Sequence, residues 1–100
     1  MAALLSVARI DWIESVGPYV RVYTEGKSSL IRIALRELEE SLDPKHFFRI
    51  HRSAMVNLDR VKELTHWSHG DYLIILQDGT ELKLSRTRKT DLEKLLRADL

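Results

Sequence analysis

All four glycines of this 100-residue chain lie in short turn-like sequences, and these turns set the length of the segments between them. They occur at Gly17-Pro18, Gly26-Lys27, His69-Gly70-Asp71 and Asp78-Gly79. Apolar segments of a few residues flank each turn, a pattern that is typical of strands joined by hairpins. The sequence therefore predicts a mostly β fold with antiparallel neighbouring strands.

The expected strands fall in two groups, one before residue 34 and one after residue 60. They are Leu4–Ala8, Ile10–Glu14, Tyr19–Glu25, Ser29–Ile33, Val61–Trp67, Tyr72–Gln77 and Glu81–Ser85. In the third of these, Val20 and Val22 alternate with polar or aromatic residues, so one face of the strand is expected to point inward.

Two segments have helical spacing instead. Leucines at i, i+3 and i+7 predict an amphipathic helix over Ala34–Leu42, which ends at Asp43-Pro44 because a residue before proline avoids helical angles. A second helix is predicted near the C-terminus from Leu92, Leu95, Leu96 and Leu100. It begins either at a capping box, Thr90-x-x-Glu93, or earlier with Ser85 as the N-cap.

The segment from Phe47 to Asn57 combines apolar and basic residues. As an extended chain it points Phe48 and Ile50 to the core and places polar side chains on the opposite face. These are Arg49, His51 and Ser53, with Arg52 near the point where the strand ends. Such side chains can donate to phosphates, and an arginine can pair bidentately with guanine. An ordinary solvated strand face has the same pattern.

A second basic segment, Lys83–Lys89, has four basic residues and two hydroxyls in seven positions and no acid. It lies where a strand becomes a helix, so free backbone amides and the helix dipole also favour an anion. The net charge is only +1, yet residues 44–100 hold eleven basic and eight acidic side chains. Alone, either segment is explained by solvation, but together they favour one surface for a polyanion.

Other functional classes have little support. The chain has four histidines and no cysteine, and it has neither an HExxH motif nor a glycine-rich phosphate loop. Ser53 lies near His51, but no acid that would orient such a pair is evident. We therefore expect no enzyme, metal or cofactor. No apolar segment approaches the ~18 to 20 residues of a membrane span, so we expect one cytoplasmic domain over residues 1–100.

The segment Phe47–Leu58, with its sequence FFRIHRSAMVNL, resembles the LytTR domain, the DNA-binding output module of many bacterial two-component response regulators. The resemblance extends from about Asp11 to Leu96. It also includes Gly17-Pro18-Tyr19-Val20-Arg21-Val22, Leu35-x-x-Leu38-Glu39-x-x-Leu42, Gly70-Asp71-Tyr72, Asp78-Gly79-Thr80 and Ser85-Arg86. Ala54 departs from the family pattern, which usually has a larger residue there, and Pro18 replaces a residue that is often polar.

The resemblance implies an elongated stack of small antiparallel β-sheets with two short helices. It implies sequence-specific binding of double-stranded DNA for transcription regulation, through loops in successive major grooves. The positions carried over are Tyr19, His51, Arg52, Ser53, Lys83, Arg86, Thr87 and Arg88. Arg52 and Lys83 are expected mainly at phosphates, and Arg86, Thr87 or Arg88 at base edges.

The implied partners are paired half-sites in promoter DNA, a second copy bound beside the first, and a receiver or sensor domain in the same or another chain. A protein-interaction module without DNA binding is the alternative, because the net charge is close to zero.

Overall fold

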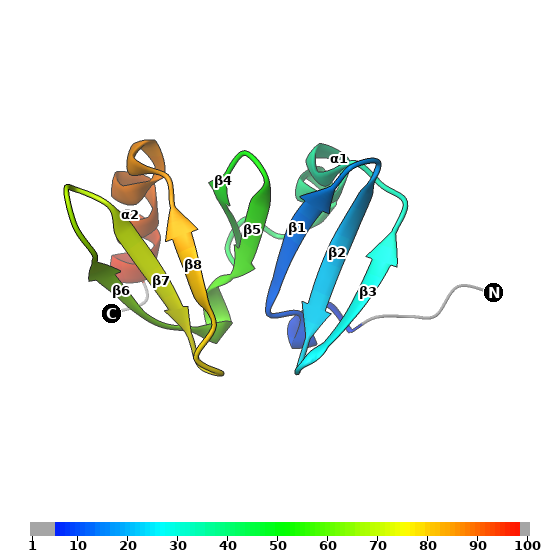
Figure 1. The fold of residues 1–100 in the computed structure, drawn as a ribbon, viewed down its shortest axis with the longest axis horizontal. Helices are drawn as coiled ribbons and strands as arrows, with labels where there is room; N and C mark the ends of the chain where they lie inside the picture. Colours follow the sequence, from blue (N-terminus) through cyan, green and yellow to red (C-terminus); the bar gives the residue numbers. More distant parts are fainter. Residues whose placement is uncertain (1–5, 99–100) are drawn as a thin grey trace.

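A computed structural model describes residues 6–98, and within this range eight strands pair into two antiparallel sheets (Figure 1). The five-stranded sheet has the order β3-β2-β1-β5-β4, with β1 at Trp12–Val16, β2 at Tyr19–Thr24, β3 at Lys27–Ile31, β4 at Phe47–His51 and β5 at Ala54–Asn57. The three-stranded sheet follows chain order, with β6 at Val61–His66, β7 at Tyr72–Leu76 and β8 at Glu81–Leu84. The predicted mostly β fold is confirmed.

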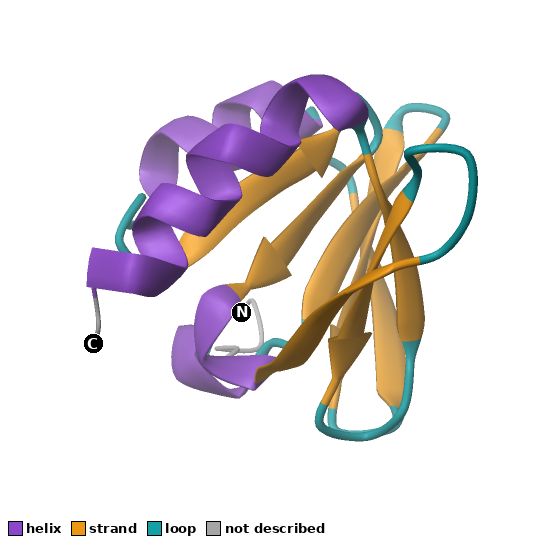
Figure 2. Ribbon diagram, turned by 90° about the vertical axis from the view of Figure 1, so that its left-hand side faces the viewer, coloured by secondary structure: helices purple, strands orange, loops and turns teal. Residues whose placement is uncertain are grey.

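The helices are short. They are α1 (Leu35–Ser41) and α2 (Lys89–Ala98), with single 3-10 turns η1 (Val7–Arg9), η2 (Leu58–Arg60) and η3 (Arg86–Arg88). Figure 2 shows α1 and α2 on the same side of the strands. The sheets lie next to each other along the longest axis, and the molecule measures 44 × 28 × 24 Å. The predicted elongated shape is therefore confirmed.

The glycine turns form hairpins as the sequence predicts. Glu25 and Gly26 have φ of 50° and 83°, and together they join β2 to β3 with Thr24 opposite Lys27. Positive φ at both central residues matches the right-handed twist of the flanking strands. Gly17 has φ of 58° in the two-residue turn between Val16 and Tyr19.

Two hydrophobic cores share the β4–β5 hairpin. The first lies between the five-stranded sheet and α1 and contains Ile10, Ile13, Val20, Val22, Leu35, Leu42, Phe47 and Met55. The second contains Phe48, Ile50, Ala54, Val56, Leu58, Ile74, Leu76, Leu82, Leu84 and Leu92, from the hairpin, the three-stranded sheet and α2. Neighbouring residues of β4, such as Phe47 and Phe48, thus enter different cores. Fully burying an aliphatic side chain contributes roughly 1.5–3 kcal/mol, so the hairpin is firmly held on both faces.

Several predicted boundaries are wrong. Residues 4 and 5 of the expected strand Leu4–Ala8 lie outside the described range, and its end belongs to η1, because no neighbouring strand pairs with this segment. Phe47–Asn57 is a hairpin with a turn at Arg52-Ser53, not one extended strand.

Of the two starts proposed for the second helix, the earlier one is observed. Ser85 is extended immediately before η3, and Thr90 lies inside α2. The Ser85 hydroxyl lies 3.0 Å from the Thr87 hydroxyl and forms no cap with a backbone amide.

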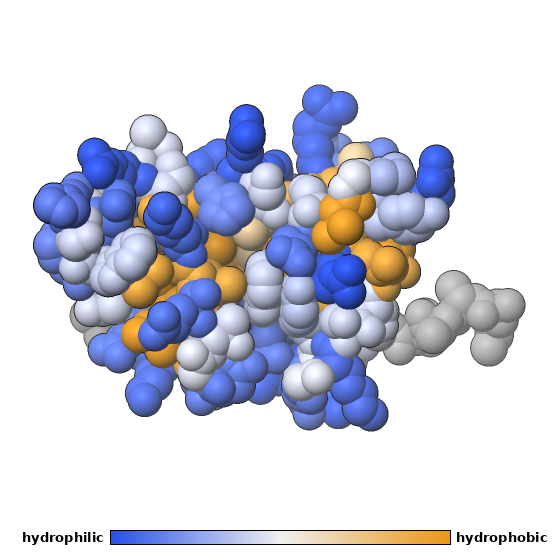
Figure 3. Space-filling view, viewed as in Figure 1, coloured by the Kyte–Doolittle hydropathy of each residue, from blue (hydrophilic) through white to orange (hydrophobic). Residues whose placement is uncertain are grey.

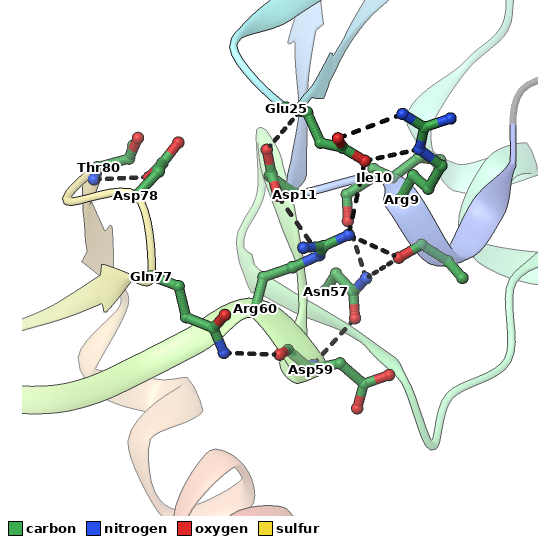
Figure 4. Close-up of polar contacts among 11 residues, drawn as sticks. Arg9, Ile10, Asp11, Glu25, Asn57, Asp59, Arg60, Gln77, Asp78 and Thr80 are labelled. Carbon is green, nitrogen blue, oxygen red and sulfur yellow. Dashed lines mark hydrogen bonds and ion pairs between the residues drawn. The ribbon is translucent and has the colours of Figure 1, made fainter.

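A polar network fixes the junction between the sheets (Figure 4). The buried Asn57 amide donates to the Ile10 carbonyl at 2.8 Å and accepts from the Asp59 N–H at 3.0 Å. Arg60 lies 3.6 Å from Asp11, and its backbone carbonyl accepts from the Gln77 N–H at 2.9 Å. These bonds tie η2, where the chain passes between the sheets, to the segment before β1 and to the end of β7.

Candidate nucleic-acid interface

Four connections meet along the upper edge of the molecule in Figure 1: the β1–β2, β4–β5 and β6–β7 turns and the β8–α2 junction. Hydrophilic side chains project from this edge in the space-filling view (Figure 3). All the residues proposed from the sequence to bind DNA lie in or next to these connections. We call this surface the loop edge.

The β4–β5 turn is held from behind by Arg49. Its guanidinium donates to the backbone carbonyls of His51, at 3.0 Å, and of Arg52. It also forms an ion pair of 2.8 Å with Glu39 of α1. The Arg49 side chain is only 16% exposed, so it supports the turn and is not part of the free surface.

His51 completes the turn as a hydrogen-bond acceptor. Its Nδ1 accepts from the Ser53 N–H at 3.1 Å. Burial lowers the pKa of the His51 imidazole below its ordinary value, and the positive charges of Arg49 and Arg52 lower it further. A neutral imidazole that accepts at Nδ1 carries its proton on Nε2, so Nε2 is the position from which His51 can donate. Arg52 itself is exposed.

The second basic segment lies directly beside this turn. The Ser85 N–H donates to the Ile50 carbonyl at 2.9 Å, which joins the end of β8 to the free edge of β4. The two segments border one open hollow of about 600 Å³. It is lined by His51, Arg52, Ser53, Asp71, Lys83, Leu84, Ser85 and Arg86. The structure thus brings together the two basic segments that the sequence singled out.

The basic side chains around the hollow differ in how they are paired. Arg86 donates to the Asp71 carboxylate at 3.1 Å and to the His69 carbonyl at 2.8 Å, so it is tied to the β6–β7 loop. Within residues 6–98, Arg52, Lys83 and Arg88 form no ion pair with a carboxylate. Their charges are therefore available to an anion.

Tyr19 lies on the loop edge but apart from the hollow. It is 38% exposed at the start of β2, with the Arg32 guanidinium 5.5 Å from the centre of its ring. Strand β1 lies between β2 and β5, and at the usual strand spacing this puts Tyr19 about 10 Å from β5. It belongs to a separate part of the edge.

Sequence reasoning missed three residues here. It placed Arg49 on an outer face, named Asp71 only as a turn residue, and assigned Trp67 to the strand Val61–Trp67, whereas Trp67 follows β6 and is 57% exposed. Trp12 and Tyr23 do stack, with ring centres 4.2 Å apart. The position of Trp67 beside a glycine-containing turn was the signal that could have separated it from them.

Within residues 6–98, no group of three His, Asp or Glu side chains is arranged to hold a metal ion. No helix between residues 6 and 98 is long and apolar enough to cross a membrane.

Comparison with known proteins gives a consistent result. The family model described as "LytTr DNA-binding domain" matches residues 2–97. The sensory transduction protein LytT of Bacillus subtilis strain 168 is 36% identical over 78 residues, which are 78% of this chain and 32% of LytT. The transcriptional regulatory protein YpdB of Escherichia coli K12 is 34% identical over 76 residues, which are 75% of this chain and 31% of YpdB. This chain therefore spans about a third of the length of these curated relatives.

The fold comparison agrees with the sequence comparison. A solved LytTr DNA-binding domain from Bacillus cereus superposes with a TM-score of 0.80 at 25% identity. The superposition covers 89% of this chain and 82% of the solved one. The chain belongs to the LytTR family, whose members are the non-catalytic DNA-binding domains of transcriptional regulators.

Proposed function

We propose that this chain binds a specific double-stranded DNA sequence through its loop edge, as the DNA-binding part of a transcription regulator. The observation that carries the proposal is the shared hollow, where the β4–β5 turn and the β8–α2 junction place Arg52 and Lys83 on one surface. Unpaired cations on an exposed surface bind phosphates and release the counterions condensed on DNA.

The dimensions of the loop edge suit successive grooves. The molecule is 44 Å long, and the connections of the loop edge are spread along that axis (Figure 1). The major groove of B-DNA recurs every ~34 Å along one face of the helix. We propose that the two ends of the edge, at Tyr19 and at the β8–α2 junction, approach successive major grooves, with the β4–β5 turn at the phosphates between them.

The contacts divide by chemistry. Arg52 and Lys83 are assigned mainly to phosphates, together with the Ser53 hydroxyl and a proton on His51 Nε2. Arg88 and Thr87 are assigned to base edges. Arg86 reaches a base only if it leaves Asp71, because its guanidinium is already bonded to the carboxylate and to the His69 carbonyl.

The regulatory context is proposed from the relatives. LytT is described as a sensory transduction protein and YpdB as a transcriptional regulatory protein. We propose that this domain acts in the cytoplasm with a receiver or sensor domain, in the same or another chain. We also propose that two copies bind paired half-sites and contact each other there, since a contact that links two bound copies raises the affinity of each.

The test is selection of duplexes from a random pool, followed by titration of the recovered duplex with variants. Arg88→Ala should cost about 1–3 kcal/mol and relax the preference at one position, as loss of a base contact does. Arg52→Ala should weaken all duplexes alike and make the salt dependence less steep. Lys27→Ala is the matched control, because Lys27 is exposed at the start of β3, next to the β2–β3 turn, which lies on the opposite edge (Figure 1).

Parental affinity in both Arg52→Ala and Arg88→Ala would show that the loop edge is not the DNA surface. The main alternative is a protein-interaction module, favoured by the near-neutral net charge. It predicts no salt-dependent binding of any duplex and stable binding of a protein partner.

A further inference from the structure

Trp67 is an exposed aromatic side chain on the loop edge, and no role described above uses it. It follows β6 directly and is 57% exposed, more than any other large apolar side chain assessed within residues 6–98. Single exposed apolar side chains are common on protein surfaces, so exposure alone does not define a binding site. The ordered loop and the positive charge around Trp67 indicate what it contacts.

The loop that carries Trp67 is firmly held. The Trp67 N–H donates to the Asp71 carbonyl and the Asp71 N–H to the Ser68 carbonyl, both at 2.8 Å. Arg86 fixes the same loop from the β8–α2 junction through Asp71 and the His69 carbonyl. Gly70, with φ of 81°, lies against the Arg86 guanidinium, which would be 3.8 Å from a Cβ at this position. Trp67 is thus displayed on an ordered loop, which lowers the entropic cost of a contact there.

Lys83 places a positive charge next to the Trp67 ring. Its Nζ lies 5.9 Å from the ring centre, within the range of a cation–π contact. Lys83 also lines the hollow, so the aromatic ring is continuous with the proposed DNA surface. Asp71 also lines the hollow, but its carboxylate is paired with Arg86, and this pairing reduces the repulsion between Asp71 and a phosphate.

We propose that Trp67 and Lys83 form an additional contact to the sugar–phosphate backbone of duplex DNA, at the outer end of the loop edge. The indole ring covers a deoxyribose, its Nε1–H donates to a phosphate oxygen, and Lys83 binds the neighbouring phosphate. The contact is to the backbone, so it adds affinity and leaves sequence preference unchanged. This inference rests on the proposed DNA-binding function.

The chain offers an internal control, because Trp12 and Trp67 are its two tryptophans and Trp12 is half-buried against Tyr23. In Trp12→Phe the remaining emission comes from Trp67, and in Trp67→Phe it comes from Trp12. Binding is followed by anisotropy of a labelled duplex selected by the chain, and acrylamide reports the exposure of each tryptophan without changing the ionic strength. Saturating duplex should protect Trp67 from acrylamide and leave Trp12 unaffected.

The affinity measurement is independent of fluorescence. Trp67→Ala should weaken binding about tenfold, which corresponds to ~1.4 kcal/mol, for the selected duplex and for a scrambled duplex alike. Leu30→Ala is the matched control, because Leu30 is 52% exposed on β3 and lies outside the loop edge. It should retain parental affinity.

The outcomes separate the two proposals. If the duplex binds with parental affinity to Trp67→Ala and does not protect Trp67 from acrylamide, the Trp67 contact is wrong and the DNA-binding function stands. If no variant and not even the parent binds duplex, both are wrong. Protection of Trp67 that depends on chain concentration and occurs without duplex would show self-association and would overturn the DNA contact.

Discussion

Replacement of Arg49 by methionine is the sharpest test of how the β4–β5 turn is held. Methionine keeps most of the apolar stem of the side chain and removes its three polar contacts. Each of the two bonds to carbonyl oxygens is expected to contribute about 1 kcal/mol net, because carbonyls of an exposed turn regain water when the donor is lost. Glu39 is 39% exposed, so its ion pair adds about 0.5 kcal/mol. The free energy of unfolding should therefore fall by roughly 2–3 kcal/mol.

DNA binding should weaken as well. A turn without its support must be ordered on binding, and fixing even one residue costs about 1 kcal/mol, or about fivefold in affinity. Urea denaturation gives the unfolding free energy, and anisotropy of a labelled duplex at zero urea gives the affinity of the folded variant. Glu39→Gln is the control, since it removes the ion pair and leaves both carbonyl contacts. An unchanged urea midpoint and unchanged affinity in Arg49→Met would refute the supporting role of Arg49.

Three further predictions concern separate contacts. Because the pKa of His51 is lowered in the folded state, the unfolded chain binds more protons just below pH 6.5. The free energy of unfolding should therefore decrease as the pH is lowered through that range, and it should decrease less steeply in His51→Gln. Urea denaturation at a series of pH values measures both. Asp71→Asn should weaken the hold of Arg86 on the β6–β7 loop and speed proteolysis there, whereas equal cleavage rates would contradict that hold. Asn57→Ala should cost about 2–4 kcal/mol by thermal or urea unfolding, because the Ile10 carbonyl and Asp59 N–H lose their buried partner.

Local patterns predicted most of the secondary structure. The glycine turns placed the hairpins, and the leucine spacing placed α1. The described end of the strand predicted at Leu4–Ala8 is not a strand, because apolar character alone gives no partner strand, and Val7 is in fact 48% exposed. Helix α2 follows directly after η3, which begins after Ser85, and Thr90-x-x-Glu93 has the pattern of a capping box although Thr90 is already helical.

The site was predictable in its parts and not in its assembly. Charge and hydroxyl content selected both basic segments, and the family resemblance placed them together. The bond between the Ser85 N–H and the Ile50 carbonyl joins residues far apart in the chain, and no local pattern encodes it. The prediction that Arg49 lies on an outer face was wrong. Alternation along β4 separates its two faces, but it does not show that α1 covers the face that carries Arg49. The roles of the individual side chains on DNA stay predictions.

The position of the β4–β5 hairpin between the two cores affects how the molecule unfolds. Because its two faces belong to two different cores, neither core can come apart without uncovering one face of the hairpin that also holds the other core. We expect one cooperative unfolding transition for both sheets, with the amides of β4 and β5 among the slowest to exchange with solvent. The turn at Arg52-Ser53 is then attached to the part of the molecule that opens least often, while the exposed β3 edge exchanges through local fraying. Hydrogen exchange would measure this gradient directly.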